Sequence, residues 1–98
     1  MIKGIVGYKV REDNDLEPIL MKLKSNAMQY PGFMGAENLI SEKDISIVAM
    51  VSTWDKLEDW RLWENSRITQ ELLRQAETLL IGEPRVTTYR IIPAVRWV

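Results

Sequence analysis

The chain has 98 residues, carries 13 Lys and Arg against 14 Asp and Glu, and has a formal net charge of −1 with a pI near 5.4. This balance disfavours a nucleic-acid partner or an anionic membrane, because both require a positive surface. Cysteine and histidine are absent, which excludes disulfides, thiolate nucleophiles and the commonest ligands of zinc and haem iron. We expect a single domain over residues 1–98. Since no apolar run suits a signal peptide or a membrane span, we also expect a cytoplasmic protein.

The first part of the chain predicts a strand, a helix and a second strand. Apolar side chains alternate over residues 2–10, and the acidic run 12–15 then stops the strand and offers helix N-caps. Apolar residues recur at helical spacing over 16–30, where Pro18 is acceptable in the first turn. Pro31-Gly32 ends this helix, and a strand is predicted over residues 33–41.

A polar turn at residues 42–44 leads into a third strand over 45–54 that is apolar on both sides. Asp55 is the expected N-cap of the next helix, with Glu58 at capping-box spacing. Asn65-Ser66 predicts a break, because both are poor helix formers.

The helix is predicted to resume after this break and to end at Gly82, with a last strand over 85–92 and a short apolar tail over 93–98. Its apolar stripe is expected to contain Ile68, Leu72, Ala76 and Leu79, with Leu73 and Leu80 at the edge.

The element order β-α-β-β-α-β predicts an α+β, ferredoxin-like fold, in which a four-stranded antiparallel sheet carries both helices on one face. Two helices cover only one side of such a sheet, although several strands are apolar on both sides. We therefore expect a homodimer that forms through the open sheet face.

Three short motifs resemble the antibiotic biosynthesis monooxygenase family. They are Tyr30-Pro31-Gly32-Phe33, Ser52-Thr53-Trp54 and Trp63-Glu64-Asn65-Ser66. The resemblance implies a dimeric α+β barrel with a pocket between sheet and helices in each subunit. Activities in the family include cofactor-independent oxygenation of polycyclic phenols and quinols, and oxidative haem degradation; some members resemble isomerases.

The haem-degrading branch of the family is a poor match. Trp63 keeps the position of the tryptophan that ruffles the porphyrin, but the haem-ligating histidine corresponds to Leu73 and the pocket asparagine lies near Gly7 or Tyr8. A leucine cannot ligate iron. The resemblance therefore disfavours haem degradation, and we expect no cofactor and no metal.

The cofactor-independent branch is matched in part. Its strand-closing tryptophan is Trp54, whereas Trp60 replaces a phenol and Met50 replaces an asparagine; an arginine corresponds to Arg74. The chemistry requires an apolar pocket, a group that takes or shares a proton and donors for an oxyanion. This predicts catalytic roles for Tyr8, Trp54 and Trp63, and substrate contacts for Asn38, Met50, Trp60, Leu73 and Arg74.

Each of these residues also has a structural interpretation. The tryptophans and Tyr8 are typical of core packing, and Arg74 is typical of a solvated surface. Two functions therefore stay open. The first is a cofactor-independent monooxygenase acting on a quinol or polycyclic phenol; the second is a non-catalytic dimeric barrel that binds a small hydrophobic or aromatic ligand, or an isomerase-like relative.

Overall fold

A computed structural model describes residues 1–93, so the predicted tail at 94–98 lies outside the described residues. The elements follow the predicted order, with the second helix divided. They are β1 (Ile2–Lys9), α1 (Glu17–Ala27), β2 (Phe33–Ile40), β3 (Ile47–Trp54), α2 (Leu57–Glu64), α3 (Arg67–Ala76), a 3₁₀ turn η1 (Glu77–Leu79) and β4 (Arg85–Arg90).

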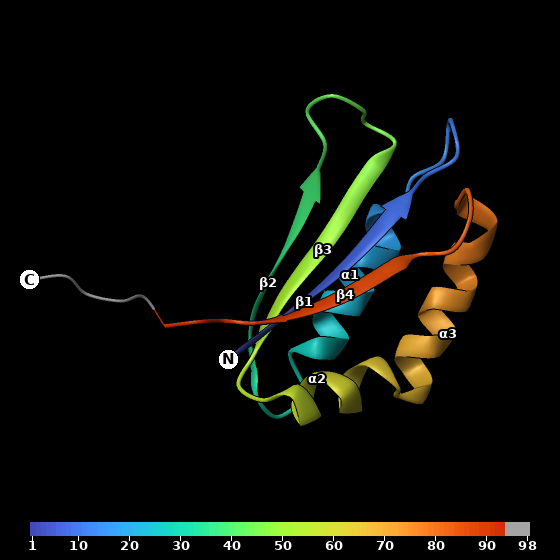
Figure 1. Cartoon of the computed structure of the whole chain (residues 1–98). Coiled ribbons are helices and arrows are strands. Elements are labelled where there is room, and N and C mark those ends of the chain that lie inside the picture. The colour runs from blue at the N-terminus through green and yellow to red at the C-terminus, as the bar shows by residue number, and fades with distance from the viewer. Residues whose placement is uncertain (94–98) are drawn as a thin grey trace, which may run out of the picture.

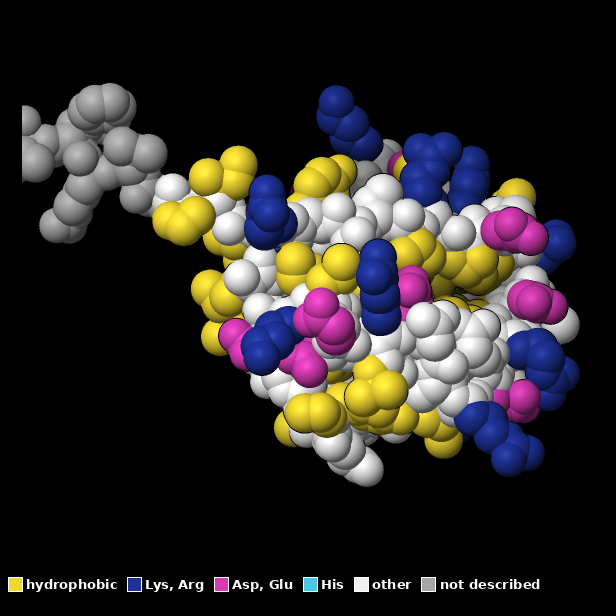
Figure 2. All heavy atoms as spheres, turned by 60° about the horizontal axis from the view of Figure 1, so that its bottom comes forward, with side chains coloured by type: hydrophobic (Ala, Val, Ile, Leu, Met, Phe, Trp, Pro, Cys, Tyr) yellow, Lys and Arg dark blue, Asp and Glu magenta, His cyan; other side chains and the backbone are white. Residues whose placement is uncertain are grey.

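The strands form one antiparallel sheet in the order β2-β3-β1-β4, and the helices lie on one of its faces (Figure 1). This confirms the predicted ferredoxin-like arrangement. Among residues 1–93, no helix is long and apolar enough to cross a membrane. On the face that carries α2, basic and acidic side chains are interspersed among apolar ones (Figure 2).

The two faces of the sheet differ in burial. Along β1, Val6 and Tyr8 point toward the helices and are buried, whereas Ile5 points to the open face and is half-buried. Because directly paired residues share a face, Val51, the partner of Ile5, also lies on the open face. The predicted alternation of β3 is confirmed, and one apolar face is left without helices.

A tryptophan cluster fills the space between the sheet and α2. Trp54, Trp60 and Trp63 are each at most 2% exposed. The Trp54 ring centroid lies 5.6 Å from that of Trp63 in a stacked pair and 5.3 Å from that of Phe33 in an edge-on pair. The Trp54 indole N–H donates to Ser52 Oγ over 2.9 Å, so its polar atom is satisfied internally.

The start of the second helix differs from the prediction. Asp55 is not the N-cap, because its backbone N–H donates to Gly32 O over 2.8 Å and extends the strand-end contacts. The helix begins two residues later at Leu57, after Lys56, which makes no side-chain cap bond. The capping box proposed with Glu58 is therefore wrong.

The predicted helix break is confirmed, and Ser66 explains it. Its side chain accepts from the backbone N–H of Thr69 over 3.3 Å and so starts α3 as a new N-cap. Restarting the helix changes its phase. Thr69 consequently faces inward, whereas Ile68, which was expected on the apolar stripe, is 50% exposed.

Three other elements are shorter than predicted. Helix α1 stops at Ala27 because turn hydrogen bonds at Gln29 and Tyr30 replace the helical ones. The β2–β3 turn extends to Ser46, and Ile45 is 79% exposed rather than part of β3. Strand β4 ends at Arg90.

The packing of Trp60 on β1 gives a testable prediction. A Cβ placed on Gly4 would collide with the Trp60 ring, whereas at Gly7 the nearest atom, Arg85 O, is 3.9 Å away. Gly4→Ala should therefore lower the free energy of unfolding by about 2 kcal/mol through overpacking. Urea denaturation measures this, with Gly7→Ala in the same strand as control. Equal stability of the two variants would contradict the packing.

Candidate functional site

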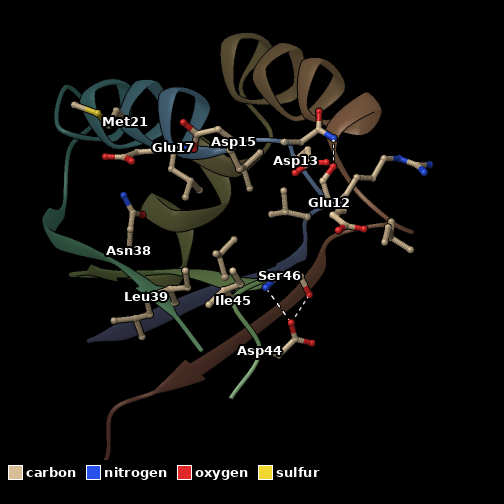
Figure 3. Close-up of a pocket in the computed structure, with 18 residues that line it drawn as sticks. Glu12, Asp13, Asp15, Glu17, Met21, Asn38, Leu39, Asp44, Ile45 and Ser46 are labelled. Atoms are coloured by element: carbon tan, nitrogen blue, oxygen red, sulfur yellow. Dashed lines mark hydrogen bonds between the residues drawn. The ribbon is translucent and has the colours of Figure 1, made fainter. Parts of the chain in front are cut away.

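A cleft of about 900 Å³ opens between α1 and the β2–β3 hairpin (Figure 3). The hairpin lies at the end of the sheet away from α2 (Figure 1). The walls of the cleft come from the loop after β1, the first turns of α1, the end of β2, the hairpin turn and the loop after η1. The lining residues are Val10, Arg11, Glu12, Asp13, Asn14, Asp15, Leu16, Glu17, Leu20, Met21, Asn38, Leu39, Ile40, Asp44, Ile45, Ser46, Val48 and Ile81.

Backbone hydrogen bonds join distant segments at this end of the sheet. Val10 donates to Ser46 O over 2.7 Å, and Ile81 donates to Lys9 O over 2.8 Å. Val10 also forms an isolated antiparallel bridge with Leu80. The hairpin turn and the loop after η1 are thereby tied to the end of β1, which holds the cleft walls in place.

The inner part of the cleft is apolar. Leu16 and Leu20 present the buried side of α1, and Val48 lies opposite on β3. Ile45, at the hairpin turn, completes the wall (Figure 3). Such a surface suits an apolar or aromatic molecule.

Asn38 supplies the amide on the sheet side of this cleft. Its side chain points from β2 toward α1, where Glu17 and Met21 lie (Figure 3). In the sheet register Asn38 is directly opposite Met50, so their side chains leave the same face from adjacent strands about 5 Å apart.

Carboxylates surround the cleft; we call them the acidic rim, which consists of Glu12, Asp13, Asp15, Glu17 and Asp44. The Ser46 hydroxyl donates to Asp44 Oδ1 over 2.6 Å and the Ser46 backbone N–H over 3.0 Å. These bonds lower the pKa of Asp44 below its usual range. Asp13 has φ 63°, a left-handed conformation that aspartate tolerates better than most residues. Across residues 1–93, no cluster of three or more acidic side chains is arranged to hold a metal ion.

Comparison with solved structures identifies this fold. An antibiotic biosynthesis monooxygenase matches with a TM-score of 0.82 at 14% identity, covering 95% of this chain and 100% of its own. A candidate antibiotic biosynthesis monooxygenase from Deinococcus radiodurans gives 0.87 at 12%, covering 100% and 99%. SnoaB, a cofactor-independent oxygenase from Streptomyces nogalater, gives 0.82 at 9% in a mutant form, covering 96% and 95%.

The chain has the antibiotic biosynthesis monooxygenase fold. The sequence resemblance is thus confirmed at the level of architecture. No family model matches the sequence, and no curated protein does.

The predicted site residues are spread over this monooxygenase fold. Asn38 lines the cleft, whereas Trp54, Trp60 and Trp63 belong to the buried cluster at the other end of β3. Trp54 lies six strand residues from Val48, or about 20 Å along β3. The tryptophans are therefore core residues rather than the lip of this cleft.

Tyr8 and Met50 are buried and do not line the cleft. Tyr8 is 4% exposed and pairs in register with Val48, which lines the cleft. Burial raises the pKa of the Tyr8 phenol well above its usual value of 10.0. Met50 is fully buried next to it in the core. A phenol in this position stays protonated at neutral pH and cannot act as a base.

Leu73 and Arg74 lie on α3, away from the cleft. Leu73 is partly buried against the core. Arg74 is exposed and forms a two-point contact with Glu71, with Nη2–Oε1 at 2.6 Å and Nε–Oε2 at 3.1 Å. In residues 1–93, Trp63 Nε1 is the one buried side-chain nitrogen or oxygen that has no hydrogen-bond partner.

Sequence reasoning missed most of the cleft lining. It interpreted the acidic run 12–15 as a strand stop and helix cap. The N-cap position is Leu16, and Asp15 Oδ1 accepts from the backbone N–H of Glu17, the first residue of α1, over 3.0 Å. An acidic run longer than a cap requires was the available signal. Nothing local places this run beside Ile45 or Ile81, because the contacts that join them are long-range.

The burial of Tyr8 predicts a pH dependence of stability. Below pH 10 the phenol is protonated in both folded and unfolded chains, so its contribution is fully present. At higher pH the unfolded chain ionises first, and stability should fall by up to about 1.4 kcal/mol per pH unit from this group.

Urea unfolding across about pH 8 to 11 measures this slope. Tyr8→Phe should flatten it, while the control Tyr89→Phe, which removes an exposed phenol, should keep the slope that Tyr8 causes. A slope unchanged in Tyr8→Phe would contradict the assignment.

Proposed function

We propose that this chain is a cofactor-independent monooxygenase that binds a quinol or polycyclic phenol in the cleft between α1 and the β2–β3 hairpin. The observation that carries the proposal is the amide of Asn38, which lines the cleft beside its apolar inner surface and lies directly across the sheet from Met50. The fold shared with a structure named as a cofactor-independent oxygenase supports it.

Asn38 compensates for a missing residue. In the resemblance, the position of Met50 belongs to an asparagine, and a thioether cannot donate a hydrogen bond. The Asn38 side chain leaves the same sheet face from the neighbouring strand. Its NH₂ group can therefore donate a hydrogen bond in the space that an asparagine at position 50 would reach. A donor aimed at an oxyanion in an apolar site stabilises developing charge strongly.

The rim supplies proton acceptors. Glu17 lies on α1 across the cleft from Asn38 (Figure 3), and its carboxylate can take the proton of a phenolic O–H. The resulting anion reduces O₂. At an activated CH₂ carbon, one oxygen atom becomes a carbonyl and the other leaves as water. The substrate supplies all four electrons, so no external reductant is required.

A second candidate is binding of a small aromatic ligand without reaction. It is favoured because none of the residues predicted as catalytic lines the cleft; Tyr8, Trp54 and Trp63 are all buried in the core. Oxygen uptake with an anthrone or quinol panel distinguishes the two functions, since pure binding consumes no oxygen.

Asn38→Ala tests the catalytic proposal. Oxygen uptake with the best substrate should fall by about a hundredfold in kcat, as expected when one oxyanion donor is removed. Gln75→Ala, which removes an exposed amide on α3 outside the cleft, is the control and should retain the parent rate. If no quinol or anthrone gives uptake above background while aromatic probes bind, the non-catalytic function replaces the oxygenase.

We also propose a homodimer through the open sheet face. Ile5 and Val51 form its centre, and Leu39 and Tyr89 are 49% and 58% exposed on its outer strands. Apolar side chains exposed together on a sheet face without helices favour a partner. The open face carries Glu37 on β2 and, beside Gly7, Arg85 on β4, so its two edges have opposite charges that a two-fold partner can pair.

Val51→Asp should convert this dimer to a monomer, because it places a charge at the centre of the interface. Sedimentation equilibrium at micromolar concentration measures the mass. Ile68→Asp, which changes an exposed apolar residue on α3, should stay dimeric. A parent chain that sediments at 11.4 kDa would refute the dimer.

A further inference from the structure

We infer that the cleft selects its ligand by charge and takes neutral or cationic aromatic molecules in preference to anionic ones. This rests on the proposed function in one respect, namely that the cleft is the binding site. It goes further by naming the charge class of the ligand, which neither the fold nor the comparisons indicate.

The first step is the position of the charges relative to the apolar interior. Leu16, Leu20 and Val48 form the inner surface, so an aromatic ring is the part of a ligand that gains from entering. A polar substituent on that ring then stays at the mouth of the cleft, in the field of the acidic rim.

The second step is that the rim surrounds the mouth from separate segments. Glu12 and Asp13 come from the loop after β1, Glu17 from α1, and Asp44 from the hairpin turn on the opposite side (Figure 3). Charges of one sign around a low-dielectric hollow reinforce one another at its mouth.

The third step is that the rim is not neutralised by ion pairs. The salt bridge found within residues 1–93 joins Arg74 to Glu71 on α3, away from the cleft. Arg11 is the one basic residue in the lining, and it makes no salt bridge to a rim carboxylate. Lys9, outside the lining, is close enough for its charge to favour ionised Asp44, but it forms no salt bridge with it. The Ser46 contacts also favour the ionised form of Asp44.

The acidic rim does not repel a neutral quinol, whereas it repels a carboxylated aromatic acid. The rim carboxylates are exposed to solvent, so water and salt weaken their field toward the apolar floor. The selection therefore acts mainly on substituents at the mouth and leaves room for ionisation of a phenol beside Asn38.

Three naphthalene probes of nearly equal size test the inference: 1-naphthylmethylammonium, 1-naphthalenemethanol and 1-naphthoate. Their affinities for the parent chain, measured by calorimetry at low salt, should decrease in that order, with about a tenfold spread between cation and anion. In 1 M NaCl the spread should collapse, because the screening length falls to about 3 Å.

A charge-neutralising variant assigns the effect to the rim. Glu12→Gln combined with Asp13→Asn should weaken the cationic probe about fivefold and leave the neutral probe unchanged; asparagine accepts the left-handed backbone at position 13. Glu58→Gln combined with Glu77→Gln removes two exposed charges outside the cleft and should change neither affinity.

The outcomes separate this inference from the proposed function. If the neutral probe binds but the anion binds equally well, the charge selection is wrong and the cleft stands as a binding site. If none of the probes binds, the cleft is not an aromatic site, and both proposals fail. The inference is supported if the affinities no longer depend on salt in the Glu12→Gln, Asp13→Asn variant but still do in the Glu58→Gln, Glu77→Gln variant.

Discussion

The contact between Trp60 and Gly4 is the constraint on which the rest of the structure depends. The indole ring occupies the space that any side chain on Gly4 would need, so α2 lies close against the first half of β1. Trp54 and Trp63 pack around the same ring, with centroid distances of 6.3 Å and 5.4 Å from Trp60. Large aromatic surfaces of this kind dominate burial in a small domain. Side chains consequently fill the space between the sheet and α2 at this end.

The opposite end of the sheet, at the β2–β3 hairpin, is packed less densely and contains the cleft. At the hairpin end none of the tryptophans within residues 1–93 fills the space between helix and sheet, and the walls are held instead by backbone bonds such as Val10 N–H to Ser46 O. The resulting cleft is bordered by loop residues, most of which are polar. The tryptophan cluster and the proposed binding site thus lie at different ends of β3. Substitutions in the tryptophan cluster should act on folding, and substitutions around Asn38 should act on the ligand.

In the proposed function, the amide across from Met50 supplies the donor that the motif would place at position 50. Linear comparison places the required asparagine on β3, where this chain has a thioether. The register Asn38↔Met50 puts an amide beside that position from β2. Because cross-strand neighbours on one face are about as close as a side chain is long, chemistry can move between strands while the pocket keeps its donor. Only the pairing of the strands reveals this.

The sequence by itself determined the order of the elements, the two faces of β1 and β3, and the break at Ser66, because period-two and helical repeats and N-cap chemistry are local properties. It did not determine where Asp55 and Ile68 would lie, since a strand-end hydrogen bond and the restarted phase of α3 decided both. Tertiary structure alone decided that the tryptophans are core and that the cleft lies at the hairpin end. The reason is physical: the cleft joins the loop after β1, α1, the hairpin and the loop after η1 through long-range pairing, and no pattern along the chain encodes those distances.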